Sequence, residues 1–199
     1  MKNLLQNSIE QSISYSEYFM RVEAAANGDL MYNDENMDFY TQLNHQRMKR
    51  LNKTIKLSEE LVQKGEGITC DLIWLVLTEG WCGDAAQILP VLNKIDEAID
   101  KVDLKLIYRD QNLELMDHFL TNGGRSIPKV VVIDKNTMDV KGDWGPRPTP
   151  AQDMFLVYKN SEVKKDYKEF QAEIQKWYTK DKAEHIQKEL LPLFDLCSD

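Results

Sequence analysis

The sequence of 199 residues is poor in cysteine and histidine and has no long apolar run, and each scarcity excludes a class of protein. Its three cysteines, Cys70, Cys82 and Cys197, are too few for a disulfide framework, and none has metal-ligand spacing to the three histidines. No stretch approaches the ~20 apolar residues of a membrane-spanning helix, and the N-terminal segment lacks the apolar core of a signal peptide. We therefore expect a cytoplasmic protein with no metal, cofactor or membrane partner, whose cysteines are all thiols.

Positive charge is also scarce, with 25 lysines and arginines against 33 acidic residues and a net charge of -8. This balance argues against a nucleic-acid partner. The basic stretch HQRMKRLNK at 45–53 lies within a helical pattern, and we interpret it as a solvated helix face. What the chain does have is a hydrophobic content of 42%, which is enough to bury a core. The sequence does not indicate an oligomeric state.

The hydrophobic periodicity predicts helices at both ends of the chain and alternating strands and helices between them. Near the N-terminus, SYSE at 14–17 forms a capping box, in which Ser14 and Glu17 begin a helix. The middle of the chain predicts the order strand, helix, strand, helix, strand, strand, at 71–77, 84–99, 102–110, 112–124, 129–134 and 137–144. Residues 151–195 return to a helical pattern after the break at GPRPTP.

This order predicts an α/β fold with a four-stranded mixed sheet. A strand–helix–strand crossover makes the first two strands parallel, and the short turn before the last strand makes the last two antiparallel. The run at 71–77 is almost entirely apolar, which is typical of a strand buried on both faces. We expect the strands at 71–77 and 129–134 to be neighbours in the centre of the sheet.

Cys82 lies where the first strand hands over to a helix, in the segment TEGWCGDAAQ. At a helix N-terminus, unpaired backbone N–H groups and the helix dipole lower the pKa of a thiol below its ordinary ~8.5. The carboxylate of Asp84, two residues away, raises that pKa, and Glu79 acts in the same direction. Arg125 opposes both if its side chain turns toward the thiol. The sequence leaves the balance between these effects open.

Three segments resemble the thioredoxin superfamily: WCGD at 81–84, DQN at 110–112 and SIPKVVVID at 126–134. The most similar group is a bacterial thioredoxin-like family that has WCGD where thioredoxin has WCGPC. The resemblance implies a thioredoxin-like domain at 66–150. It also implies that the helical segments at 1–65 and 151–199 are extensions packed on this core.

The same resemblance assigns roles to single residues. Pro128 corresponds to a cis-proline that faces the active cysteine, and Ile127 before it offers its backbone to an extended substrate. Ala85 occupies the place of the second, resolving cysteine. Asp84 stands in place of a proline, and Val76 in place of a buried aspartate that moves protons. Ordinary dithiol thioredoxin activity is therefore not expected.

Two functions remain for a single thiol. In monothiol thiol-disulfide exchange, the Cys82 thiolate attacks a protein or low-molecular-weight disulfide, and an external thiol resolves the mixed disulfide. Cys70 is a poor resolving residue because the strand between it and Cys82 spans ~23 Å, whereas Cys197 on the C-terminal tail remains a candidate. In the alternative, Cys82 is buried or unreactive, and the fold is a redox-inactive module that binds a peptide or protein.

Under the first hypothesis, Cys82 is the catalytic residue, at least partly exposed and the most reactive of the three cysteines. A shallow cleft around it holds the substrate, which is an extended peptide or a thiol that carries a carboxylate. Arg147 supplies a fork for that carboxylate. The residues that we expect to line this cleft are Trp81, Gly83, Arg125, Ile127, Pro128, Trp144 and Arg147.

Overall fold

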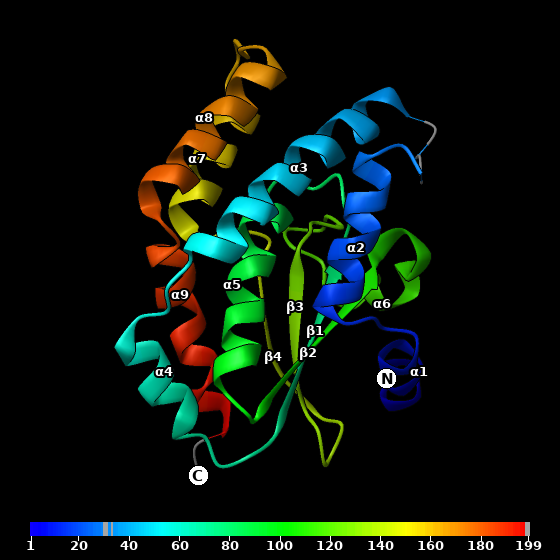
Figure 1. Ribbon diagram of the computed structural model, residues 1–199, viewed down its shortest axis with the longest axis vertical. Helices are drawn as coiled ribbons and strands as arrows, with labels where there is room; N and C mark the ends of the chain where they lie inside the picture. Colours follow the sequence, from blue (N-terminus) through cyan, green and yellow to red (C-terminus); the bar gives the residue numbers. More distant parts are fainter. Residues whose placement is uncertain (30–31, 33, 198–199) are drawn as a thin grey trace.

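The computed structural model describes residues 1–29, 32 and 34–197, and a mixed four-stranded sheet lies at its centre (Figure 1). The strands are β1 (Leu72–Thr78), β2 (Val102–Tyr108), β3 (Lys129–Asp134) and β4 (Val140–Trp144). Their order in the sheet is β2-β1-β3-β4. β1 runs parallel to β2 and antiparallel to β3, and β3 runs antiparallel to β4. The predicted fold class is confirmed, including the central pairing of the first and third strands.

Helices surround this sheet on both sides. They are α1 (Lys2–Glu10), α2 (Tyr15–Ala26), α3 (Glu35–Thr54), α4 (Glu59–Glu66), α5 (Ala85–Ala98), α6 (Leu113–Asp117), α7 (Thr149–Asn160), α8 (Tyr167–Asp181) and α9 (Glu184–Leu190), with short 3-10 turns η1 (Arg109–Gln111), η2 (Leu191–Leu193) and η3 (Asp195–Cys197). In Figure 1, α4, α5 and α9 lie on one side of the sheet, and α1, α2 and α6 lie on the other. Of the two predicted extensions, residues 30, 31, 33, 198 and 199 lie outside the described residues.

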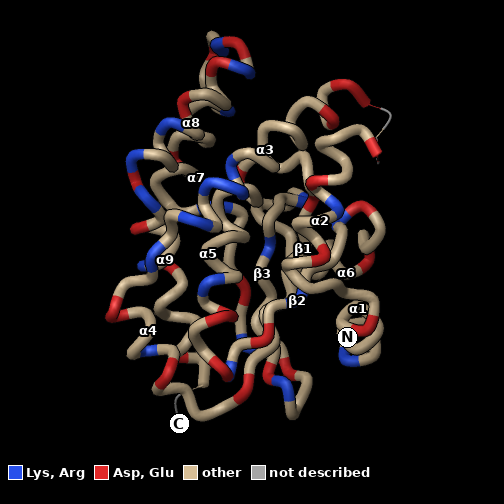
Figure 2. Tube along the Cα trace, viewed as in Figure 1, with Lys and Arg blue, Asp and Glu red and all other residues tan. Residues whose placement is uncertain are grey.

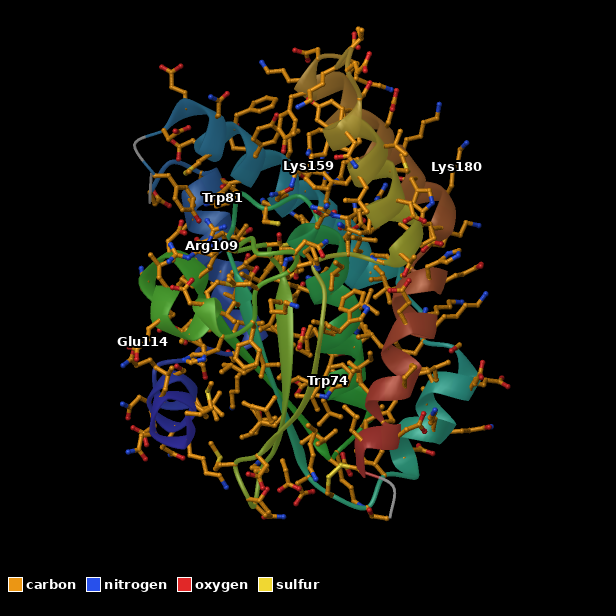
Figure 3. The ribbon with its side chains drawn as sticks, turned by 180° about the vertical axis from the view of Figure 1, so that it is seen from behind. Trp74, Trp81, Arg109, Glu114, Lys159 and Lys180 are labelled. Atoms are coloured by element: carbon orange, nitrogen blue, oxygen red, sulfur yellow. A yellow bond between two sulfur atoms is a disulfide. The ribbon has the colours of Figure 1, made fainter. Side chains whose placement is uncertain are left out.

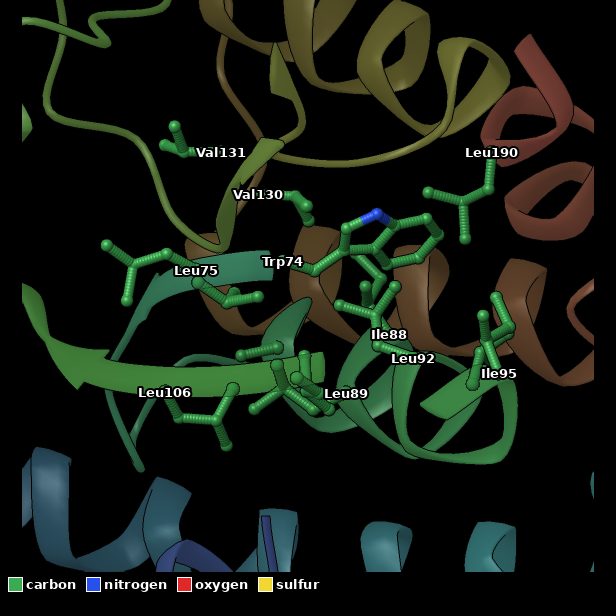
Figure 4. Packing of buried hydrophobic residues seen from close by; sticks show 14 of the residues in the cluster. Trp74, Leu75, Ile88, Leu89, Leu92, Ile95, Leu106, Val130, Val131 and Leu190 are labelled. Carbon is green, nitrogen blue, oxygen red and sulfur yellow. The ribbon is translucent and has the colours of Figure 1, made fainter. Parts of the chain in front are cut away.

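β1 is the centre of the core, and all seven of its residues are buried. It carries no charged side chain, whereas charged residues are spread over the helices around the sheet (Figure 2). Its Trp74 is fully buried and stacks on Phe194 with 5.6 Å between ring centroids. Figure 4 shows the same ring beside Ile88 of α5, Val130 of β3 and Leu190 of α9. The C-terminal extension therefore completes the core on this face of the sheet.

The N-terminal extension is joined to the opposite edge of the sheet. Ile13 and Leu106 of β2 exchange two backbone hydrogen bonds, of 2.8 and 2.9 Å, in an isolated antiparallel bridge. Directly after it, the Ser14 side chain accepts a hydrogen bond of 3.2 Å from the backbone N–H of Glu17 and caps α2, as the sequence predicts. The outer edge of β2 is thus partly covered, which protects it from pairing with another chain.

Three elements are shorter than expected, and one of them is the strand predicted at 102–110, which ends at Tyr108. The helix predicted at 112–124 ends at Asp117, because the chain then turns through Asn122, which has a φ of 50°. The strand predicted from residue 137 begins only at Val140. There the carboxylate of Asp134 accepts hydrogen bonds from two backbone N–H groups of the following turn, and Met138 has a φ of 58°. Side-chain hydrogen bonds of this kind hold a turn in place of a ladder.

The cysteines depart most clearly from expectation. Cys70 and Cys197 form a disulfide, with 5.5 Å between their Cα atoms and a sequence separation of 127. The hydroxyl of Thr69 donates a hydrogen bond of 2.5 Å to the carbonyl oxygen of Cys197 and fixes the same end of the chain. The expectation of three thiols was wrong because the C-terminal turn η3 returns to the beginning of β1. Cys82 is the free cysteine of the chain.

Candidate functional site

Cys82 lies in the turn between β1 and α5, as the sequence predicts. The turn is closed by a hydrogen bond of 3.1 Å from the backbone N–H of Cys82 to the carbonyl oxygen of Glu79. Asp84 is the N-cap position of α5, but its side chain makes no capping hydrogen bond. The first backbone N–H groups of the helix are therefore not occupied by a capping side chain, and those of Asp84 and Ala85 lower the pKa of the nearby thiol.

The thiol itself is buried, so the expectation of a partly exposed Cys82 was wrong. Only 8% of the residue is accessible to solvent. Its Sγ donates a hydrogen bond of 3.4 Å to the carbonyl oxygen of Ile127. The Ile127–Pro128 peptide bond is cis, and the Ile127 carbonyl thus lies beside the thiol. Gly145 packs close behind this loop at a φ of 120°, where a Cβ atom would lie 2.3 Å from the carbonyl oxygen of Pro128.

Burial decides the balance of charges that the sequence leaves open. Burial, and after it the negative charge of Asp84, raise the pKa of the Cys82 thiol to about 12. The backbone N–H groups at the start of α5 lower this pKa, as does the Arg147 guanidinium, but these effects are smaller. At neutral pH Cys82 is therefore a neutral thiol.

Asp84 and Arg147 form an ion pair in which both side chains are almost entirely enclosed, with 12% and 13% of their surface exposed. Two guanidinium nitrogens of Arg147 donate to the same oxygen of Asp84, at 2.9 and 2.7 Å. The Tyr178 hydroxyl of α8 donates to the other oxygen at 2.7 Å. The guanidinium also lies over the ring of Phe155, 4.5 Å from its centroid. The fork predicted for a substrate carboxylate thus binds a carboxylate of the protein itself.

A cavity of about 310 Å³ lies over the thiol. It is lined by five of the residues expected in the cleft, which are Trp81, Gly83, Arg125, Ile127 and Arg147. Arg109 joins them, with its guanidinium 5.1 Å from the centroid of the Trp81 ring, and Figure 3 shows the two side chains together. Pro128 is adjacent to this wall through Ile127. Trp144 lies elsewhere, because its Nε1 donates to Glu189 at 3.1 Å and its ring borders a separate hollow.

The cations at this cavity have acidic partners. Arg125, expected to turn toward the thiol, donates two hydrogen bonds of 2.7 and 2.8 Å to the exposed carboxylate of Asp117. Arg109 pairs in the same way with Asp110, at 2.8 Å. Gly83 contributes its carbonyl oxygen, which accepts a hydrogen bond of 3.2 Å from Gln175 of α8. Five of the seven predicted residues thus line one cavity, and all three arginines that line it have acidic partners.

Sequence reasoning missed the residues that roof the cavity. Tyr40 comes from α3, Phe155 from α7, and Tyr167 and Gln171 from α8. Figure 1 shows that α7 and α8 form a hairpin that extends past the end of the sheet, with α3 beside it. These residues carried no signal beyond the apolar face of each helix, because their role depends on contacts across the whole chain. The extensions therefore build part of the site and explain why the thiol is buried.

Within the described part of the chain, no group of three or more His, Cys, Asp or Glu side chains is placed to hold a metal ion. No described helix is both long and apolar enough to cross a membrane.

The parallel and antiparallel strand order, the strand-to-helix turn with Cys82 and the loop at Pro128 together define a thioredoxin-like protein. A family model described as Thioredoxin matches residues 30–176, and the chain belongs to this thioredoxin family. No curated protein matches the sequence.

Two solved structures share the fold. One is an HIV epitope-scaffold, with a TM-score of 0.56 and 18% identity, and the alignment covers 92% of this chain and 98% of that chain. The other is the protein of unknown function PA1234 from Pseudomonas aeruginosa, with a TM-score of 0.57, 19% identity and the same coverage of both chains. At these identities the likeness shows the fold alone.

Glu79 is a buried carboxyl group next to the site, with 3% of the residue exposed. Its burial raises its pKa to about 7, although the backbone N–H of Asp110 donates a hydrogen bond of 2.9 Å to it. The unfolded chain has the ordinary carboxyl pKa of 4.5, so between these values the folded state holds more protons. The contribution of Glu79 to the free energy of unfolding is therefore most favourable at low pH, and it falls as the pH rises from about 4.5 to 7.

We expect Glu79→Gln to raise the free energy of unfolding by roughly 2–3 kcal/mol at pH 8, because the amide keeps the acceptor for Asp110 and removes the buried charge. At pH 4.5 the variant and the natural protein should differ little. Urea unfolding at both pH values measures the difference. The matched control is Glu114→Gln at an exposed position, which should change neither value. If the stability difference between Glu79→Gln and the natural protein is the same at pH 4.5 and pH 8, the raised pKa of Glu79 is refuted.

Proposed function

We propose that this chain is a redox-inactive thioredoxin-fold module that binds a short apolar peptide segment in the cavity over Cys82. The observation that carries the proposal is the buried thiol, which donates a hydrogen bond to the Ile127 carbonyl oxygen beneath a roof of helices. In this role the uncharged Cys82 thiol forms part of the wall of the binding site. Within the thioredoxin family, the chain would then belong to a group with WCGD and no second cysteine.

The chemistry of disulfide exchange supports this proposal, because the attacking species is a thiolate. With a pKa of about 12, about one Cys82 in 10⁵ is ionised at pH 7. Asp84, the nearest carboxylate, is held by Arg147 and Tyr178 and cannot turn to accept the thiol proton. Ala85 provides no second thiol, and Cys197 is bonded to Cys70 at the opposite end of β1.

The aromatic part of the cavity wall suits apolar side chains, and the three arginines and Asp84 that also line the cavity are paired with charged residues of the protein. Tyr40, Trp81, Phe155 and Tyr167 present aromatic rings to it. Its volume of about 310 Å³ is at the lower end of ligand pockets, which suits a few side chains. Backbone groups beside a proline loop give strand-like hydrogen bonds, which recognise an extended peptide without regard to its sequence.

Monothiol exchange is the second candidate, and one observation favours it. Cys82 is among the residues that line the cavity, so a disulfide bound there would meet its sulfur directly. The Cys82 proton would first have to leave. The thiolate would then bond to one sulfur of the disulfide and release the other as a thiolate, and an external thiol would later reduce the mixed disulfide.

Timed alkylation of Cys82 by iodoacetamide across pH 6–11 separates the two candidates. We expect the rate to rise tenfold per pH unit up to at least pH 10, without a plateau, because burial keeps the thiol neutral. In denaturant the same cysteine should react at the ordinary rate of a thiol, and Cys82→Ser supplies the blank. Rapid labelling at pH 7 with a plateau below pH 8 would refute the binding module and support monothiol exchange.

A second arm of the same experiment tests binding. An acetylated and amidated Phe-Leu-Phe tripeptide should slow the labelling of Cys82 at pH 10, because it fills the cavity above the sulfur. Replacing Phe155 by alanine removes one aromatic wall and should reduce this protection. Labelling that is independent of the tripeptide at all concentrations would contradict the proposed ligand class.

A further inference from the structure

A second hollow lies outside the Cys82 cavity, with a volume of about 410 Å³. It is bordered by Arg21, Val22 and Ala25 of α2, by Tyr32, by Tyr108 at the end of β2, and by Glu79 in the turn after β1. None of these residues lines the cavity over Cys82. The hollow is therefore separate from the site of the proposed function.

The carboxylate of Glu79 has no cationic partner in this hollow. One of its oxygens accepts the backbone N–H of Asp110 at 2.9 Å, and its other oxygen has no hydrogen-bond partner among the residues that the structure describes. Among the described residues, no lysine or arginine nitrogen lies within 4.0 Å of the Glu79 carboxylate. Arg109 is nearby, but it pairs with Asp110. Buried charges are ordinarily paired, so a carboxylate that is only 3% exposed and borders a hollow lacks its expected partner.

The walls of this hollow suit a cation with an apolar body. Aromatic faces attract cations, and two tyrosine rings, of Tyr32 and Tyr108, border the space. The ring of Tyr108 already receives one cation at the rim, where the Arg21 guanidinium lies 5.9 Å from its centroid. Val22 and Ala25 give the apolar remainder. The net charge of -8 further favours the approach of a positive ligand.

We propose that this hollow binds a primary ammonium compound with a small aromatic or aliphatic body. Its ammonium group donates hydrogen bonds to the free oxygen of Glu79, and its body lies between the tyrosine rings and α2. The volume is within the range of small-ligand sites. The ligand thus supplies a positive charge to Glu79, because the Arg21 guanidinium, which also lines the hollow, is bound to Glu17 at 2.7 Å.

Titration with 2-phenylethylamine, followed by the NMR shift of the Asp110 amide, tests this site at pH 8. The neutral analogue 2-phenylethanol has the same shape without the charge. We expect the amine to bind at least tenfold more tightly than the alcohol to the natural protein. In Glu79→Gln, which keeps the acceptor for the Asp110 N–H, the affinity for the amine should fall to that for the alcohol.

Two controls keep the result specific to this hollow. Glu114→Gln removes an exposed carboxylate and should leave amine binding unchanged. Cys82→Ser should also leave it unchanged, so this proposal stands or fails independently of the Cys82 site. The proposal is overturned if the amine and the alcohol bind equally well, or if the amine binds Glu79→Gln as tightly as it binds the natural protein. It is also overturned if the Asp110 amide does not shift at up to about 10 mM amine, a concentration that occupies even millimolar sites.

Discussion

Replacing Cys70 and Cys197 together by serine should lower the free energy of unfolding by about 3–5 kcal/mol. The disulfide joins positions that are 127 residues apart, so it restricts nearly two thirds of the unfolded chain. In the chain-entropy model, the stabilisation grows with the logarithm of the loop length, and loops of this size lie at the upper end. For a chain of this size, the loss corresponds to a fall of roughly 10 °C in Tm.

Urea unfolding of the oxidised protein, the reduced protein and the double-serine variant measures this effect. The reduced protein and the variant should have the same lower midpoint, and a reducing agent should not move the midpoint of the variant. Cys82→Ser is the matched single-cysteine control, because it leaves the Cys70–Cys197 bond intact and keeps the response to reductant. Identical midpoints with and without reductant would contradict the prediction.

Much of the fold was readable from the sequence because local signals and global structure agree. The apolar run of β1 indicated a strand buried on both faces, and all of its residues are buried. The position of Cys82 between a strand and a helix followed from two adjacent periodicities. Ser14 caps the beginning of α2 as predicted, although the Glu17 side chain binds Arg21 and does not complete the capping box. Each of these features depends on neighbours within a few residues.

Features that depend on distant contacts were not readable. The partner of Cys70 is at the other end of the chain, and its distance in sequence gives no sign of its distance in space. The same holds for Arg147, whose carboxylate partner Asp84 is 63 positions away. The burial of Cys82 depends on α3, α7 and α8, which belong to the extensions. The helix-terminus argument for a reactive thiol was sound locally, but desolvation by burial outweighs it.

Asp84 is the residue at which stability and thiol chemistry meet. Its carboxylate binds Arg147 and Tyr178, and all three side chains are largely enclosed. Replacing Asp84 by alanine leaves a guanidinium buried without its counter-charge. Removing one partner of a buried pair ordinarily costs about 3–5 kcal/mol, and we expect a loss of this size in the free energy of unfolding. The additional change Arg147→Met should recover much of the loss, because no uncompensated charge then remains.

The same variant tests the electrostatics of the thiol. The negative charge of Asp84 raises the pKa of Cys82, and the positive charge of Arg147 lowers it. In Asp84→Ala the first effect is gone and the second remains, so alkylation of Cys82 at a fixed pH should be faster than in the natural protein. In the double variant both effects are absent, and the rate should lie below that of Asp84→Ala. Labelling is compared at urea concentrations far below each unfolding midpoint, so that only folded protein reacts.

Asp117→Ala is the matched control for this pair. It removes the partner of Arg125 at the exposed rim of the same cavity, where water screens the charges. It should leave both the unfolding midpoint and the Cys82 rate nearly unchanged. If Asp84→Ala is as stable as Asp117→Ala, the ion pair with Arg147 contributes nothing to the fold. If it is destabilised but labels no faster, the pKa of Cys82 is set by burial alone, and Asp84 is a structural anchor for α8 and the loop before α7.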